Sequence, residues 1–198
     1  RDLRAFSIEW RVEMLYQLAQ TLDYLHMRGQ AHRDIKPENI MFRVNPEPDM
    51  LPQPVLIDFG LSQKRILREE QVNDTTRIQQ RAATIAYASP DWIRARKNRR
   101  SQSVVQPDAA AYDMWSLGMV AYQLFHDGQY AFGRPDEPAT LLEQRIVHEM
   151  HKPFRDDLPT PLKNLVRDLL QKSDAERPTA EAFVDALERT SGVVSPRL

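Results

Sequence analysis

A dense group of ionisable side chains separates two segments that both have to be buried. Residues 30–42 read QAHRDIKPENIMF, with two acids, two bases and one imidazole within eight positions. An apolar pattern of helical period precedes this stretch, and an apolar strand-like run follows it. Because charged groups are rarely buried without partners, the stretch predicts either a solvated turn or a site where the charges carry out chemistry.

The segments on either side can be assigned from their periodicity. Apolar residues recur at helical spacing before the charged stretch, at Ile8, Leu15, Leu18, Leu22 and Leu25. Ser7 is placed to cap the start of this helix, and Gly29 follows its end. After the charged stretch, residues 39–44 and 54–58 form two short apolar runs that indicate strands. A connection rich in Pro and Asp separates them, as in a loose hairpin.

The rest of the chain has few strand signals. Residues 61–90 are polar and irregular, which is typical of a long surface segment. Residues 114–125 are apolar nearly all round, as expected for a central buried helix. Three further segments have the pattern of amphipathic helices, at 141–150, 161–172 and 179–189. The predicted fold class is therefore α+β, mainly α.

Composition narrows the functional classes. The 198 residues contain 27 Lys plus Arg and 28 Asp plus Glu, so charge favours no nucleic acid partner. The absence of cysteine excludes disulfides and suits an intracellular protein, cytoplasmic or in an organelle. No apolar run approaches the roughly 18 residues of a membrane span, and no signal peptide opens the sequence. The first residue is Arg1 rather than Met, which suggests a piece of a longer protein.

Two motifs carry a family resemblance. The sequence His-Arg-Asp-Ile-Lys-Pro-Glu-Asn at 32–39 resembles the catalytic loop of protein kinases, in the form similar to their Ser/Thr branch. Asp-Phe-Gly at 58–60 resembles their metal-binding turn. An isolated Asp-Phe-Gly is usually a strand end and turn, but the order of both motifs around a predicted hairpin favours chemistry.

The resemblance implies a fold as well as a function. It covers the chain as a kinase C-terminal lobe, a helical bundle with short β-hairpins at the catalytic cleft. It divides residues 1–198 into a catalytic loop (32–39), a metal-binding turn (58–60), an activation segment (58–91) and a central helix from residue 113.

The same resemblance implies roles for individual residues in ATP-dependent phosphoryl transfer. Asp34 would accept the proton of the substrate hydroxyl, and Lys36 would contact the transferred phosphate. Since alternate residues of an extended loop face the same side, these two can converge. Asn39 and Asp58 would supply oxygen ligands to Mg²⁺, with Mn²⁺ as the alternative ion. Met41 would form an adenine floor, and a core methionine is an equal alternative.

Other matches imply structural roles. Residues 83–91, ATIAYASPD, resemble the end of an activation segment, with Ala-Thr for the usual Gly-Thr and Ser-Pro-Asp for Ala-Pro-Glu. Thr84 would line the acceptor site, although a buried loop hydroxyl is the alternative. Asp91 would keep an ion pair with Arg177 despite being one methylene shorter.

The start of the central helix also matches. Asp113 would accept hydrogen bonds from the backbone of the catalytic loop. His32 and Phe59 would stack above the central helix without taking part in chemistry, and Gly60 completes the metal-binding turn.

Regulation and substrate preference are less clearly indicated. Arg33 would bind a phosphate on the activation segment. However, the usual phosphorylated position is Gln80. Thr75 and Thr76 are the nearest upstream candidates, and ordinary loop threonines are the alternative.

Two further features concern what binds to the chain. Glu38 lies where some relatives bind basic substrate residues, but Gln123 replaces their second acid, so a basic preference is not supported. The basic run 94–100, RARKNRR, predicts a solvated loop, with a docking patch for an acidic partner as the sharper alternative.

Parts of a complete kinase are missing from the sequence. The six glycines allow no G-x-G-x-x-G loop, and no Val-Ala-Ile-Lys strand precedes the first helix. These parts belong to the N-lobe, which is then a required partner from the same parent chain or from another. We expect the parent protein to phosphorylate Ser or Thr of protein substrates, and this chain alone to be weakly active or inactive. The face toward the N-lobe should expose apolar surface.

A rival hypothesis is a kinase-like interaction or scaffold module without catalysis. The intact residues Asp34, Lys36, Asn39 and Asp58 argue against it. The departures at Ala83, Ser89 and Gln80 favour it slightly.

Overall fold

The computed structural model describes residues 6–43, 52–58, 85–97 and 107–190. Within these ranges a small hairpin joins a larger set of helices, in agreement with the mainly α prediction. The elements, in chain order, are α1 (Ile8–His26), η2 (Pro37–Asn39), β1 (Ile40–Arg43), β2 (Gln53–Leu56), α3 (Pro90–Lys97), α4 (Ala109–Phe125), α5 (Ala139–His148), α6 (Thr160–Leu169), η4 (Asp174–Glu176) and α7 (Ala180–Thr190).

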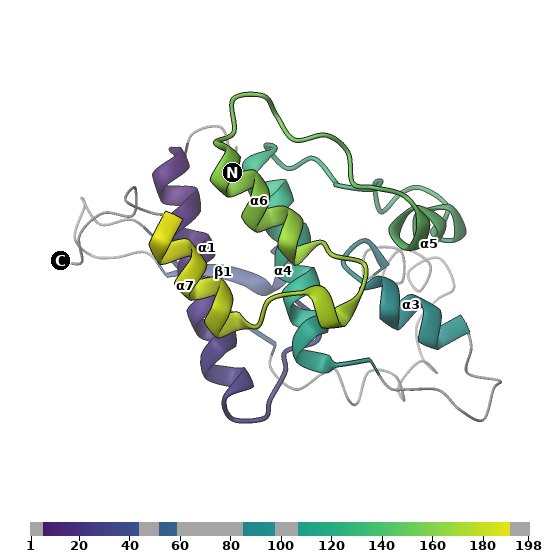
Figure 1. Cartoon of the computed structure of the whole chain (residues 1–198), viewed down its shortest axis with the longest axis horizontal. Coiled ribbons are helices and arrows are strands. Elements are labelled where there is room, and N and C mark those ends of the chain that lie inside the picture. Colours follow the sequence, from purple (N-terminus) through teal and green to yellow (C-terminus); the bar gives the residue numbers. More distant parts are fainter. Residues whose placement is uncertain (1–5, 44–51, 59–84, 98–106, 191–198) are drawn as a thin grey trace.

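Helix α4 forms the centre of the bundle. Its side chains are buried without a break from Tyr112 to Phe125, which confirms the prediction of a central buried helix. Helices α1 and α6 pack against it, α7 packs on both of them, and α3 packs on α5 at the other side (Figure 1). Since α4 contacts elements from both ends of the chain, it is the common support of the fold.

The start of α4 differs from the prediction. The helix begins at Ala109, four residues before Asp113, rather than at residue 113 itself. Asp108 caps this earlier start, because its Oδ1 accepts a hydrogen bond of 2.8 Å from the N–H of Ala111. Three alanines then fill the first turn and favour the helix. Asp113 therefore projects from the second turn, inside the bundle rather than at the end of the helix.

Helix α1 follows the sequence prediction closely. Its cap is Ser7, whose hydroxyl oxygen accepts a 3.3 Å hydrogen bond from the N–H of Trp10. The chain leaves the helix through Gly29, which has a φ of +68°. Only glycine adopts this left-handed conformation without strain. The turn directs residues 30–39 back across α4.

Strands β1 and β2 pair antiparallel, with Ile40 opposite Leu56. The ladder continues one residue further, because the N–H of Ile57 donates to the carbonyl of Asn39 at 3.0 Å. The hairpin therefore joins the end of the charged stretch to the residue before Asp58. Both strands lie near the positions predicted from the two apolar runs.

Helix α3 was not predicted. Residues 94–97 belong to it, so the described part of the basic run is helical rather than a solvated loop. Ser89 precedes the helix and accepts a 3.2 Å hydrogen bond from the N–H of Trp92, and Pro90 occupies the first helical position. Both residue types favour a helix start.

His126, just after α4, ties the helix to a later loop. Its Nδ1 donates to the carbonyl of Tyr122 at 2.8 Å, and its Nε2 accepts from the N–H of Arg155 at 3.1 Å. These roles require the neutral imidazole. Burial lowers the pKa of His126 below its usual value, and the positive charge of Arg155 acts in the same direction.

Of the helices in the described residues, none combines the length and apolar character needed to cross a membrane.

Candidate active site

Asp113 fixes the path of the charged loop. Its side chain is fully buried in α4. One carboxylate oxygen accepts from the N–H of His32 at 2.7 Å and the other from the N–H of Arg33 at 2.6 Å. The Nε2 of His26 lies 3.0 Å from the same carboxylate. Three polar groups from two segments therefore converge on one buried acid, as buried charges require.

The backbone at Arg33 is strained, with a φ of +64°. A non-glycine residue in this region costs of order 1–3 kcal/mol and persists only where its surroundings hold it. The hydrogen bond to Asp113 is part of that support. We conclude that α4 holds the loop in a shape that it would not adopt alone.

His32 acts as a spacer between the loop and the hairpin. It is almost completely buried. Its Nδ1 accepts from the N–H of Asp34 at 3.3 Å, so its Nε2 carries the hydrogen and donates to the carbonyl of Ile57 at 2.9 Å. The neutral ring therefore couples the loop before Asp34 to the strand end before Asp58.

Asp34, Lys36 and Asn39 form a compact cluster on one side of the loop. The Nζ of Lys36 lies 2.9 Å from each carboxylate oxygen of Asp34. The two side chains thus converge, as the alternation of an extended loop predicts. The amide nitrogen of Asn39 donates to the backbone carbonyl of Asp34 at 2.7 Å and to its carboxylate at 2.9 Å. Both amide hydrogens are therefore used within the cluster.

Asp58 follows the strand end that pairs with Asn39. It is half-buried and has a φ of +70°, so a second non-glycine residue at this site is held in the left-handed region. The Ile57–Asn39 hydrogen bond of the hairpin places the two backbones side by side.

The oxygens of the Asn39 amide and the Asp58 carboxylate are ligands of the kind that Mg²⁺ prefers, so the donor set fits a hard divalent ion. Within the described ranges, no group of three or more His, Cys, Asp or Glu could hold a metal, so a metal here would rest on this pair and on added ligands.

Two tyrosines near the loop had no assigned role in the sequence interpretation. Tyr112 is buried, which raises the pKa of its phenol above the usual range, and the charges of Asp34 and Asp113 raise it further. Tyr87 is also buried, and its hydroxyl donates to Oε1 of Gln123 at 2.7 Å. Burial is the largest cause that raises the pKa of the Tyr87 phenol, and the negative charge of Glu38 raises it further. Both phenols therefore stay neutral beside the acids of the loop.

The Tyr87 contact gives Gln123 a structural role. The amide oxygen of Gln123 accepts from Tyr87 inside the fold, so Gln123 has a structural partner in this structure. The absence of a preference for basic substrates stays a prediction. No pattern in the sequence linked Tyr87 to Gln123, or His26 to Asp113, because these contacts join distant segments.

Asp91 and Arg177 form the ion pair that the sequence suggested. The Nη2 of Arg177 lies 2.5 Å from Oδ2 of Asp91, and only 1% of the arginine side chain is exposed. Arg177 also donates to the carbonyl of Gln171 at 2.9 Å. The shorter acid therefore still reaches its partner. Ser89, a departure from the family pattern, is accounted for by its capping of α3.

Apolar side chains are exposed on the hairpin. Met41, Phe42 and Ile57 are 55%, 40% and 37% exposed, respectively. Met41 is thus not a core methionine in this structure. The sequence led us to expect exposed apolar surface, and these three side chains supply some of it; that an N-lobe covers it stays a prediction.

The described part of the basic run is paired within the protein. Arg94 lies 3.3 Å from Asp91, and both Arg96 and Lys97 contact Glu143 of α5. These internal pairs reduce the charge that residues 94–97 offer to an acidic partner. Several predicted positions lie outside the described residues: Phe59, Gly60, Thr75, Thr76, Gln80, Ala83, Thr84 and 98–100.

The chain is similar in sequence to known protein kinases. A family model described as "Protein kinase domain" matches residues 3–187. A calcium/calmodulin-dependent protein kinase, cmkA, of Emericella nidulans is 30% identical over 85% of the chain and 36% of its own length. A putative serine/threonine-protein kinase of Mycoplasma pneumoniae is 27% identical over 81% of this chain and 42% of its own length. The human mitochondrial serine/threonine-protein kinase PINK1 is 30% identical over 88% of this chain and 29% of its own length. The chain thus spans less than half of each relative.

Proposed function

The chain belongs to the protein kinase family, and on that premise we propose that it is the C-terminal lobe of an ATP-dependent Ser/Thr kinase. The observation that carries the proposal is the cluster around Asp34, in which Lys36 and Asn39 both contact its carboxylate. A plain charged turn has no need for this arrangement. The relatives that are named as Ser/Thr kinases support the choice of acceptor.

Asp34 is proposed as the group that receives the proton of the acceptor hydroxyl. A positioned proton acceptor typically contributes about 10²–10⁴-fold to a rate. Its position is fixed through Asn39, which holds both its backbone carbonyl and its carboxylate. Lys36 would neutralise the charge of the transferred group from the same side of the loop.

A divalent ion bound with ATP would neutralise charge on the nucleotide phosphates. Asn39 and Asp58 are the residues proposed to hold it. Because both amide hydrogens of Asn39 face Asp34, the amide oxygen is the atom that it can offer to a metal. The strand pairing between Ile57 and Asn39 keeps the two ligands on neighbouring backbones.

We further propose that activity requires an N-lobe, supplied by the parent chain or by another chain. The 198 residues contain no glycine-rich phosphate loop and no lysine strand to align ATP from above. Alignment can account for about 7–11 kcal/mol of a reaction barrier. Protein substrates with Ser or Thr are the proposed acceptors.

The test uses the longest natural protein that contains this chain. ATP-dependent phosphorylation of a generic Ser/Thr substrate is measured for the unmodified protein and for Asp34→Asn. We expect the variant to lose at least 10²-fold in rate while its melting temperature stays within a few degrees. Asp136→Asn, an exposed position paired only with Arg134 in the described residues, is the matched control and should retain full activity.

A scaffold without catalysis gives a different result. In that case neither the unmodified protein nor the variants would label the substrate, and nucleotide with Mg²⁺ would not raise the melting temperature. That outcome would refute the proposed function.

A further inference from the structure

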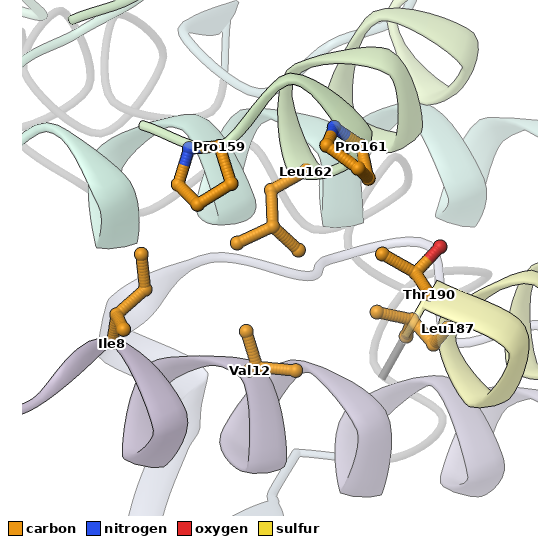
Figure 2. A pocket seen from close by; sticks show the side chains of 7 residues that line it. All are labelled: Ile8, Val12, Pro159, Pro161, Leu162, Leu187 and Thr190. Atoms are coloured by element: carbon orange, nitrogen blue, oxygen red, sulfur yellow. The ribbon is translucent and has the colours of Figure 1, made fainter. Parts of the chain in front are cut away.

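Two places in the helix bundle lie apart from the candidate active site. One is an apolar cavity between α1, α6 and α7, whose seven lining residues include no ionisable side chain (Figure 2). The other surrounds Lys172, a half-buried residue that follows α6 and contacts residues of α3, α4 and α5. A lysine amine is a nucleophile when it is neutral, so its surroundings decide what it can do.

Two aromatic rings face the amine of Lys172. Its Nζ lies 4.0 Å from the centroid of the Phe132 ring and 5.2 Å from that of the Trp115 ring. Both rings are buried, so they exclude water from part of the amine's surroundings. Nζ also donates a hydrogen bond to the carbonyl of Ile146, in the last turn of α5. The amine is therefore held between the central helix and the end of α5.

The charges that act on Lys172 come from several segments. Arg94 of α3 donates to the carbonyl of Lys172 at 3.3 Å and to that of Val147 at 3.4 Å, so a second cation lies nearby. Burial is the largest cause that lowers the pKa of Lys172 to about 8, Arg94 acts in the same direction, and Glu149 opposes it. The positive charge of Lys172 in turn lowers the pKa of His151. Desolvation and a neighbouring cation are the two features that activate lysine amines in proteins.

The Trp115 ring adds an unused donor. Its Nε1–H is buried and has no hydrogen-bond acceptor in the part of the chain that the structure describes. Arg177 lies over the same ring, 5.8 Å from its centroid, so this ring already faces a second cation. An amide formed on Lys172 brings a carbonyl oxygen toward the ring and keeps one N–H for the carbonyl of Ile146. The site therefore suits a neutral acyl-lysine better than an adduct that keeps or adds charge.

We propose that Lys172 is a site of N-acylation by a small acyl thioester, with an acetyl thioester as the simplest donor. The neutral Nζ attacks the thioester carbonyl carbon, the N–C bond forms, and the C–S bond breaks. The leaving thiolate is neutralised by the proton that Nζ releases. The product is a neutral amide facing Phe132 and Trp115. The proposal does not depend on kinase activity.

The test treats the 198-residue chain with the acetyl thioester of N-acetylcysteamine between pH 7 and pH 10. Peptide mass spectrometry measures the rate at each lysine, and the exposed Lys152 is the internal control. The lowered pKa gives Lys172 about two-hundredfold more neutral amine at pH 7.5 than an ordinary lysine has, and burial of the nucleophile offsets part of this gain. We expect Lys172 to react at least tenfold faster than Lys152 at pH 7.5. Its rate should level off above pH 8, whereas the rate at Lys152 should keep rising to pH 10.

Two substitutions test the surroundings of the amine. Arg94→Gln removes the neighbouring cation and should slow acetylation of Lys172 at least twofold at pH 7.5. Arg134→Gln changes an exposed arginine in the same way and should leave that rate unchanged. Phe132→Leu removes the nearer ring and should also slow the reaction, and Arg94→Gln provides the test if this core change prevents folding.

Three results would overturn the proposal. The first is acetylation of Lys172 no faster than that of Lys152 at pH 7.5. The second is an equal excess at Lys172 in the urea-unfolded chain, because local sequence rather than the folded surroundings would then be the cause. The third is an equal effect of Arg94→Gln and Arg134→Gln on the rate at Lys172.

Discussion

Replacement of Asp113 by Asn tests how the central helix holds the catalytic loop. The carboxylate accepts two backbone hydrogen bonds, at 2.7 and 2.6 Å, and each is charge-assisted. Asn offers one acceptor oxygen and places an NH₂ group against the other backbone N–H. A charge-assisted hydrogen bond contributes about 1.5–3 kcal/mol, and a neutral one about 1 kcal/mol. One bond is lost and the other weakened, so we expect a loss of about 3 kcal/mol.

This loss corresponds to roughly a 150-fold change in the folding equilibrium constant. Urea unfolding of the 198-residue chain measures it, with the free energy of unfolding extrapolated to zero denaturant. Hydrogen exchange at the amides of His32 and Arg33 locates the effect, because one of these N–H groups loses its acceptor and the hydrogen bond of the other is weakened. Both amides should exchange faster than they do in the unmodified chain, and the acceleration should exceed that of amides far from Asp113.

Asp108→Asn is the matched control. It makes the same chemical change in the same helix, but at the exposed N-cap, where Asn serves as well as Asp. Its free energy of unfolding should stay within about 0.5 kcal/mol of the unmodified chain. If Asp113→Asn unfolds at the same urea concentration as Asp108→Asn, the hydrogen bonds of Asp113 do not hold the loop and the reasoning is refuted.

Two further predictions concern the buried ion pair and the pH dependence of stability. Asp91→Asn leaves the buried guanidinium of Arg177 without its charge partner and should lower the free energy of unfolding by about 3 kcal/mol. Asp136→Asn should change it by less than 0.5 kcal/mol, and similar losses in both variants would contradict the role of burial. The pKa of His126 is lower in the native state than in the unfolded chain, so protonation of this side chain favours unfolding. The contribution of neutral His126 to the free energy of unfolding is therefore complete above the unfolded pKa of about 6.5 and declines as pH falls below it. Urea unfolding between pH 8 and pH 5 should show a smaller decline for His126→Gln than for the exposed control His148→Gln, and parallel curves would disprove the assignment.

Several features of the fold were predictable from the sequence because their causes are local. The helix from Ile8 follows from apolar spacing and a cap at Ser7, both contained in a few turns of chain. The two strands follow from short apolar runs. Helix α3 was missed because a run of basic residues has no apolar period, and the cap at Ser89 was interpreted only as a departure from a motif.

The candidate site divides in the same way. Asp34, Lys36 and Asn39 lie within six positions, so the sequence determined that their side chains would be neighbours, and residue type indicated the chemistry. The tertiary structure alone decided that Asp113 reaches this loop from 80 positions away, that Arg177 meets Asp91 across 86 positions, and that α1, α6 and α7 enclose a cavity. Apolar periodicity and helix capping depend on residues within one or two helical turns. These long-range pairings depend on which faces of the helices the whole chain buries against one another.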